Sequence, residues 1–267
     1  MSDIFPAGNA YRGEHVQLDL PVLVAGENTV IVPDGIEAVL VLLNGDVTLW
    51  WGATDDGGID EHHVSRRDVF DAPATALYMP PGSSTEISVH SRTEFALAAT
   101  VGGDLHAPDD AEPRLVNSED VVVHQRGQPG WQRAVHDIVD RSVPAQRLLV
   151  GETFNAAGEW SSFPPHKHDG GDGEPALEEV YYYRFDRPDG FGFQGLYENA
   201  DSEHGGSERA VFLRHGAVVG IPRGYHPVCA APGYRLYYLW ALGTAPGTPR
   251  ALALHEDPAH RWLHDAG

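Results

Sequence analysis

The stretches "ALYMPPGSSTEISVHSRTEFALAATVGG" (76–103) and "VVGIPRGYHPVCAAPGYRLYYLWALG" (218–243) follow the same plan. Each has an apolar strand, a Pro-x-Gly turn, a few small or polar residues and a second apolar strand. When the two turns are aligned, Ser84 falls opposite His226. A Pro-x-Gly turn between strands is common by itself, but matching strands on both sides favour a duplicated β domain.

Segments with strand character recur along the whole chain. They are rich in β-branched and aromatic residues and are bounded by Gly, Pro, Asn or Asp, whereas no long segment has a helical period. The sequence therefore predicts an all-β protein, built as a barrel or a sandwich, with a polar joint near 106–145. The predicted strands are 29–33, 38–43, 46–51, 76–80, 94–101, 146–154, 179–185, 191–198, 217–222 and 235–242.

Composition limits the choice of partners and compartment. The 267 residues carry a formal net charge of −21, which argues against a nucleic-acid partner because phosphate binding needs a basic surface. An anionic substrate would need a local positive centre, such as a metal ion or a placed arginine. The single cysteine, Cys229, excludes an internal disulfide, and neither a signal peptide nor an apolar stretch of ~20 residues is present. We therefore expect a cytoplasmic protein that binds no membrane.

The stretch "PPHKHDGGDGEPALEEVYYY" (164–183) carries the residues for a metal site. On a strand, residues two apart share a face, so His166 and His168 point the same way. A third histidine, His226, follows the second Pro-x-Gly turn. Three imidazoles and one carboxylate would bind a divalent metal and leave positions open for substrate or water. The carboxylates available nearby are Glu174, Glu178 and Glu179.

The order H-x-H, glutamate at the start of a strand, and histidine after Pro-x-Gly resembles the metal site of the cupins. Over about 146–262 the chain is similar to the 5-deoxyglucuronate isomerase family of inositol catabolism, which is related to the uronate isomerase of pectin degradation. The stretches that carry the resemblance are "WSSFPPHKHD", "LEEVYYYRFDRPDGFGFQGLYE" and "VGIPRGYHPVCAAPGYRLYYLWAL". The insertion "DGGDGEPALE" between the second histidine and the glutamate departs from the usual cupin spacing.

The resemblance implies a bicupin, two tandem β-barrel (jelly-roll) domains. It places a degenerate N-terminal cupin without metal at 1–115, a linker at 116–145 and a metal-binding cupin at 146–267. The implied ligands are His166, His168, Glu179 and His226, and the implied ion is divalent, zinc first, with manganese or iron also fitting. The first half has no matching H-x-H. A homo-oligomer is expected from the family.

The implied reaction is an aldose–ketose isomerisation that converts 5-deoxy-D-glucuronate to 5-dehydro-2-deoxy-D-gluconate in myo-inositol catabolism. Candidates for the general base are Tyr181, Tyr183 and Lys167, although strand alternation points Lys167 away from the metal. Alternation places Tyr181 and Tyr183 on the same face as Glu179 and turns Glu178 away. Arg223, Arg184 or Lys167 could receive the carboxylate of this small sugar acid. Two alternatives stay open: a cupin Fe(II) dioxygenase, and an isomerase of another uronic acid. A non-enzymatic sugar-binding bicupin conflicts with an intact ligand set.

Three other motifs carry no separate function. The glycines of "GFGFQG" (190–195) have the spacing of a dinucleotide-binding loop, but without a following helix they predict a hairpin. His62 and His63 lie in "DEHHVSRRD", which we interpret as a solvent-facing turn region. Cys229 has no partnered base nearby in the sequence and is predicted to be a small buried residue.

Overall fold

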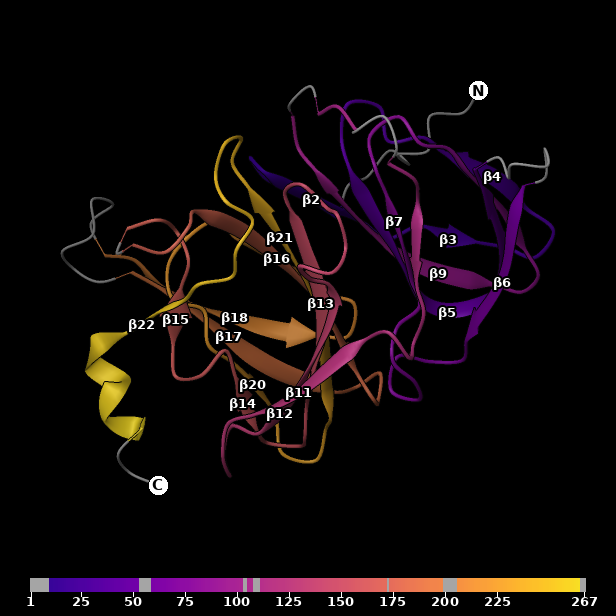
Figure 1. The fold of residues 1–267 in the computed structure, drawn as a ribbon. Coiled ribbons are helices and arrows are strands. Elements are labelled where there is room, and N and C mark those ends of the chain that lie inside the picture. The colour runs from indigo at the N-terminus through magenta and orange to yellow at the C-terminus, as the bar shows by residue number, and fades with distance from the viewer. Residues whose placement is uncertain are drawn as a thin grey trace. The chain divides into compact units, whose positions relative to one another are not determined.

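The computed structural model describes residues 10–52, 59–102, 105–107, 111–171, 173–198 and 206–264. Almost all regular structure in this part of the chain is β-strand, with one short 3-10 helix near the C-terminus (Figure 1), which confirms the all-β class. The chain divides into two compact units, Met1–Val122 with Asp137–Val150, and Val123–His136 with Gly151–Gly267. No helix in the described ranges is long and apolar enough to cross a membrane.

The first unit contains one ten-stranded, antiparallel system. Its main path runs β1-β2-β9-β5-β7-β10, while β3, β4, β6 and β8 pair at its sides. The strands are β1 (Tyr11–Arg12), β2 (Val16–Asp19), β3 (Val22–Leu23), β4 (Asn28–Ile31), β5 (Ala38–Trp51), β6 (Asp60–Arg66), β7 (Ala76–Met79), β8 (Thr85–Val89), β9 (Thr93–Thr100) and β10 (Arg114–Val116).

Strand β5 corrects one prediction, because the segments 38–43 and 46–51 form a single strand of 14 residues. Its pairing with β9 shifts register between Leu42 and Asn44, which is a β-bulge. Gly45 has a φ of 124°, and a Cβ there would lie 2.2 Å from Thr93 Oγ1. The glycine therefore bends the strand instead of ending it. The first part of β5 pairs with β7 and β9, and the second part pairs with β6 and β8.

The second unit contains most of a six-stranded sheet in the order β11-β12-β13-β21-β16-β19, of which residues 122, 137–139 and 148–150 belong to the first unit. It also contains a four-stranded sheet in the order β14-β20-β17-β18 and the pair β15-β22. The elements are β11 (Val122–Arg126), β12 (Arg133–Val139), β13 (Leu148–Asn155), β14 (Trp160–Ser161), β15 (His166–Lys167), β16 (Leu177–Phe185), β17 (Phe191–Tyr197), β18 (Glu208–Arg214), β19 (Val218–Ile221), β20 (Val228–Ala230), β21 (Leu236–Thr244), β22 (His255–Glu256) and the 3-10 helix η1 (Pro258–His264).

The internal repeat read from the sequence is present in the strand pairing. In the first unit β5 lies between β9 and β7, and in the second β16 lies between β21 and β19. The glycines of the two Pro-x-Gly turns, Gly82 and Gly224, have nearly equal φ angles of 79° and 82°. Pairing also places Ala38 opposite Met79 and Glu179 opposite Ile221, so Ala38 occupies the position that corresponds to Glu179.

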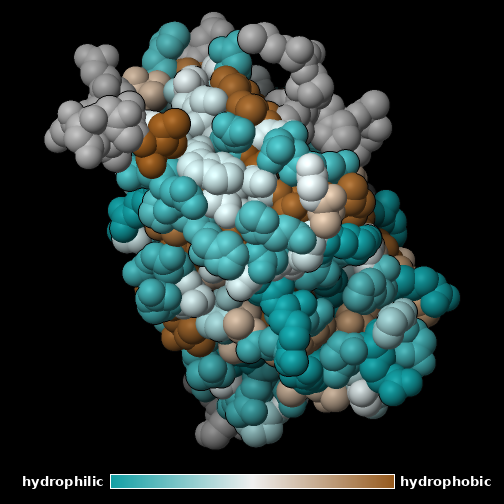
Figure 2. Space-filling model, turned by 90° about the vertical axis from the view of Figure 1, so that its right-hand side faces the viewer, coloured by the Kyte–Doolittle hydropathy of each residue, from teal (hydrophilic) through white to brown (hydrophobic). Residues whose placement is uncertain are grey.

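Strands β16 and β21 form the buried centre of the second unit. Every residue of both strands is buried, although β16 carries two glutamates and an arginine. Buried charges are costly unless they are paired or hold an ion, so these side chains need specific partners. By contrast, the face of the molecule in Figure 2 is mostly hydrophilic, with hydrophobic residues scattered in small groups.

Two segments differ from their sequence interpretation. Part of the stretch predicted as a linker, 116–145, forms β11 and β12 at the edge of the six-stranded sheet. The boundaries 1–115, 116–145 and 146–267 stay a prediction. His62 and His63 lie in strand β6 instead of a turn, and His62 stacks on Trp51 with ring centroids 4.3 Å apart. The "GFGFQG" stretch forms β17, which pairs with β18 as the predicted hairpin.

Candidate metal centre

The site begins with one face of β16. Side chains alternate along a strand, so Glu179, Tyr181 and Tyr183 point to the same side of the sheet. On the neighbouring strand β21, Trp240 lies opposite Tyr181 and Tyr238 lies opposite Tyr183. Residues directly opposite in an antiparallel pair share a face, so Tyr238 joins this row. The rings of Tyr181 and Tyr238 are 4.6 Å apart. We call this side the inner face of the sheet.

Two histidines from distant parts of the chain meet Glu179. His168 Nε2 lies 3.0 Å from Glu179 Oε2, and His226 Nε2 lies 3.4 Å from the same oxygen. All three residues are buried, and one ligand atom from each lies within 4.8 Å of the others. His226 comes from the turn after β19, the strand that pairs with β16 beside Glu179. The strand pairing therefore determines the position of the third ligand.

His166 lies beside this group without being part of its tight triangle. Its ring centroid is 4.8 Å from that of His226 and 6.4 Å from that of His168. The four residues predicted as ligands are thus neighbours in the structure, and three of them lie close enough to hold one metal ion. Their role as ligands is taken up below as a proposal.

The hydrogen bonds of the three imidazoles fit a metal. In each ring Nδ1 faces a backbone carbonyl: Pro164 O at 3.3 Å for His166, Leu177 O at 3.0 Å for His168, and Gly224 O at 2.9 Å for His226. A ring that donates from Nδ1 presents the lone pair of Nε2, and this is how metal-binding histidines are usually oriented. The buried Nε2 of His226 has no hydrogen-bond partner among the residues that the structure describes.

Electrostatics lead to the same conclusion. Burial lowers the pKa of His166 and of His226 to about 3, so both rings are neutral at pH 7. Burial also opposes charging of His168, but the adjacent Glu179 carboxylate raises the pKa of this ring. The lone pair of a neutral Nε2 and a carboxylate oxygen repel each other at 3 Å unless a proton or a cation lies between them. A divalent cation at this point would satisfy His168, His226 and Glu179 together.

The loop that carries His226 is fixed by backbone contacts. Gly224 has a positive φ, and a Cβ on it would lie 2.6 Å from Tyr197 O. Its N–H donates to Asp169 Oδ2 at 3.0 Å. Although burial alone raises the pKa of Asp169, hydrogen bonds from Lys167 and Gly224 hold it below its ordinary value. Asp169 therefore ties the H-x-H segment to the turn that positions His226.

Lys167 is committed to carboxylates. Its Nζ lies 2.7 Å from Asp169 Oδ1 and 2.6 Å from Glu174 Oε1, and its side chain is only 10% exposed. An ammonium group bound to two carboxylates is a poor proton acceptor, which argues against Lys167 as the general base. The same two ion pairs also argue against Lys167 as the group that binds a substrate carboxylate. Glu174, which the sequence offered as a ligand, serves this ion-pair cluster instead.

The two arginines predicted to bind the substrate do not join the inner face. Arg184 follows Tyr183 on β16 and therefore points to the opposite side, where its Nε donates to Tyr182 Oη at 2.9 Å. Arg223 is 47% exposed and its Nε donates to Glu198 at 3.1 Å. Alternation along the strand also turns Glu178 away from Glu179, as predicted from the sequence.

The tyrosines are placed as predicted, and the structure adds polar partners. The Tyr181 and Ser162 hydroxyls are 3.0 Å apart, and the ring of Tyr181 is 6.0 Å from that of His226. Tyr183 donates to Gln194 Oε1 at 2.8 Å. Burial raises the pKa of both Tyr181 and Tyr183 well above the usual value, so each keeps its proton.

Sequence reasoning missed Gln194 and Ser162, although both lie in quoted stretches, because "GFGFQG" was interpreted for its glycines and "WSSFPPHKHD" for its histidines. Gln194 is fully buried, and its amide Nε2 has no hydrogen-bond partner among the described residues. Ser162 has a φ of 48°, in the left-handed region that non-glycine residues rarely adopt. The unpartnered amide beside Tyr183 marks the inner face as a place for a polar ligand. Cys229, in contrast, is half-buried on β20, and burial raises the pKa of its thiol.

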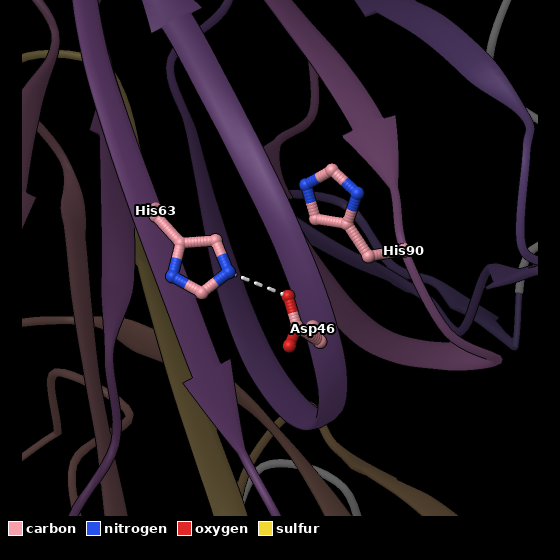
Figure 3. A group of neighbouring side chains, drawn as sticks. All are labelled: Asp46, His63 and His90. Carbon is pink, nitrogen blue, oxygen red and sulfur yellow. Dashed lines mark hydrogen bonds and ion pairs between the residues drawn. The ribbon is translucent and has the colours of Figure 1, made fainter.

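A second group of potential ligands lies in the first unit. Figure 3 shows Asp46, His63 and His90, with the His63 ring turned toward the carboxylate at 2.7 Å. Their ligand atoms also lie within 4.8 Å of one another. Both histidines are exposed, however, and His90 Nε2 is already 2.7 Å from Thr48 Oγ1. Water and these partners satisfy the group, so the buried centre in the second unit is the better metal candidate.

Comparison with known proteins covers both units. A family model described as the KduI/IolB family matches residues 4–263. A 5-deoxy-glucuronate isomerase of Geobacillus kaustophilus (strain HTA426) is 33% identical over 262 residues, which are 95% of this chain and 87% of that protein. The crystal structure of an IolB-like protein from Salmonella typhimurium LT2 has a TM-score of 0.81 at 32% identity, covering 94% of this chain and 90% of that one.

A more distant structure bears on the fold alone. Oxalate decarboxylase of Lactobacillus farciminis, in its formate complex, has a TM-score of 0.63 at 12% identity and covers 96% of this chain and 82% of that one. The likeness extends over both units, as expected for two tandem barrels of the same type. The predicted bicupin architecture is thus confirmed.

Proposed function

The chain belongs to the KduI/IolB family, and we propose that it is a metal-dependent aldose–ketose isomerase that converts 5-deoxy-D-glucuronate to 5-dehydro-2-deoxy-D-gluconate in myo-inositol catabolism. The observation that supports this is the buried meeting of His168, His226 and Glu179 beside His166. The relatives named 5-deoxy-glucuronate isomerase support the substrate, since the likeness covers almost the whole chain.

We propose His166, His168, Glu179 and His226 as the ligands of one divalent ion. Mixed nitrogen and oxygen ligands suit zinc, and manganese or iron are also compatible with them. When bound, the ion supplies a Lewis acid that polarises the carbonyl of the sugar acid and stabilises the negative charge that develops during the transfer. The backbone carbonyls that accept from Nδ1 keep the three rings oriented for this role.

The isomerisation removes the proton on C2 of the substrate and returns a proton to C1, while the hydroxyl proton moves from O2 to O1. Because Tyr181 keeps its proton and lies next to His226, we propose that it donates a hydrogen bond or a proton to the oxygen on which charge develops. Ser162 holds its hydroxyl at 3.0 Å. Tyr183 donates a hydrogen bond to Gln194 Oε1, so we propose that it orients this amide and does not act on the substrate directly.

The test combines metal analysis with an isomerase assay on 5-deoxyglucuronate, for wild type, His226→Ala and a matched control. The control is His63→Ala, which removes an exposed histidine from the second group of potential ligands. We expect about one ion per chain in wild type and in His63→Ala. In His226→Ala we expect metal affinity to fall by more than about 100-fold, together with turnover.

Each outcome bears on a different part of the proposal. Loss of metal from His63→Ala but not from His226→Ala would move the metal site to the first unit. Metal without isomerisation, accompanied by O₂ consumption, would favour an oxygenase over an isomerase. A folded, active and metal-free wild type would rule out the proposed chemistry.

A further inference from the structure

Arg133 is a cation on the inner face that has no role in the site described above. Arg133 begins β12, in the stretch expected from the sequence to be a linker. Three residues along the strand, His136 packs on Phe154 at 4.7 Å, and Phe154 packs on Tyr237. Tyr237 faces away from Tyr238, so His136 lies on the outer face. Because residues an odd number apart point to opposite sides, Arg133 lies on the inner face with Tyr238 and Tyr181.

The backbone around Arg133 is anchored to the segment that leads to His166. Trp160 N donates to Gly130 O at 2.9 Å, and Gln132 N donates to Glu159 Oε2 at 2.8 Å. The ring of Trp131 packs on Phe163 at 5.3 Å. The charge of Arg133 lowers the pKa of Tyr238 and of His166, and Tyr238 and Tyr181 in turn oppose the lowering of the Arg133 pKa by burial. The backbone on both sides of Arg133 is therefore fixed against the segment that leads to His166.

Within the part of the chain that the structure describes, this guanidinium has no anionic partner. Its single hydrogen bond among the described residues is from Nη1 to Trp131 O at 3.2 Å, and no carboxylate of that part of the chain lies within ion-pair distance. The negative charge of Glu256 raises the pKa of Arg133, but the Glu256 carboxylate is hydrogen-bonded to His264 Nε2 at 2.7 Å. Burial lowers the pKa of Arg133, yet a guanidinium stays protonated in proteins. A partly buried cation whose other four N–H groups meet no acceptor among the described residues, in a chain of net charge −21, is suited to bind an external anion.

We propose that Arg133 binds the carboxylate of the sugar-acid substrate, an inference that rests on the isomerase function proposed above. The aldehyde and the adjacent hydroxyl lie at one end of such an acid and the carboxylate at the other. The histidines and Glu179 would hold the first end, and Arg133 the second, with Tyr181 and Tyr238 between them. The planar guanidinium can form two parallel hydrogen bonds to a carboxylate, which fixes orientation as well as charge.

The experiment compares 5-deoxyglucuronate with its neutral methyl ester in wild type, Arg133→Met and Arg133→Lys. The matched control is Arg235→Met, an exposed arginine paired with Asp186 beyond the far end of β16, roughly 20 Å from Glu179 along the strand. We expect Arg133→Met to lower kcat/KM for the acid at least about 30-fold and to leave kcat/KM for the ester within about threefold. Arg133→Lys should recover only part of the loss. Metal content and thermal stability are measured for each variant.

Binding is measured separately by calorimetry with the acid whose C1 aldehyde has been reduced to an alcohol, which cannot isomerise. If wild type isomerises the substrate but Arg133→Met keeps its preference for acid over ester, the inference is overturned and the isomerase function stands. If wild type does not isomerise but binds the reduced acid in an Arg133-dependent way, the carboxylate site stands and the proposed reaction fails. Binding of the reduced acid that is unaffected by Arg133→Met would also overturn the inference.

Discussion

Replacing Lys167 by methionine separates a structural role for this residue from the catalytic one that the sequence suggests. Lys167 Nζ contacts Asp169 Oδ1 at 2.7 Å and Glu174 Oε1 at 2.6 Å, and the three side chains are 10%, 21% and 2% exposed. At an effective dielectric constant of about 20, each contact has a gross attraction of about 6 kcal/mol. Repulsion between the two carboxylates and the desolvation of all three groups offset most of this sum.

The net cost of the substitution follows from what it leaves behind. Lys167→Met leaves the buried Glu174 without its ammonium partner, and removing one partner of a buried ion pair costs about 3–5 kcal/mol. For a unit of this size we expect a fall in Tm of roughly 10 °C or more. The H-x-H segment and the turn that carries His226 also lose part of their link through Asp169. Activity should therefore fall together with stability and metal content.

A double variant provides the control. Lys167→Met with Glu174→Leu also removes the buried carboxylate that lost its ammonium partner, so most of the stability should return. Denaturant unfolding, metal analysis and the isomerase assay are applied to both variants and to Lys167→Arg. If activity returns with stability, Lys167 acts through structure. A stable, metal-loaded double variant without activity would refute this reasoning and restore Lys167 as a catalytic group.

Three further predictions concern other buried groups. Glu37 is fully buried and accepts hydrogen bonds from Tyr78 and from the backbone N–H groups of 146–148, so Glu37→Ala should cost at least about 4 kcal/mol in denaturant unfolding; a loss below 1 kcal/mol would contradict these contacts. Burial, only partly offset by Arg12, raises the pKa of Asp19 to about 6, so its contribution to stability is present below pH 4 and is lost as the pH rises through 6. Asp19→Asn should remove this loss and be up to about 3 kcal/mol more stable than wild type at pH 8, whereas equal unfolding curves from pH 4 to 8 would show that the carboxylate is not perturbed. Gly224→Ala should lower stability by about 1–3 kcal/mol and weaken metal binding, because the new Cβ would lie against Tyr197 O. Gly82→Ala has a similar φ but open space, so it should carry only the backbone cost and leave metal content unchanged.

The pattern of the sequence was sufficient for the fold and for the outline of the site. Alternation along a strand placed Glu179, Tyr181 and Tyr183 on one face, and the repeated Pro-x-Gly turn placed His226 beside them. Both features depend on residues close in sequence, for which the period of a strand fixes direction. The same argument failed at Asn44-Gly45, where the glycine bends β5 into a second pairing instead of ending it. A bulge and a turn use the same residue types, and only the neighbouring strands distinguish them.

The tertiary structure decided which charges are available. The sequence offered Arg223, Arg184 and Lys167 as receptors for a carboxylate, with arginine having the better geometry, but each has a partner that comes from pairing or loop packing. Arg133 had no motif around it and lies in a stretch that resembled a linker, yet sheet order brings it to the inner face. Local periodicity determines the side of a strand to which a residue points. The strands and loops that meet on that side are set by contacts between residues far apart in the chain, and these contacts determine whether a buried cation is already neutralised or free to bind a substrate.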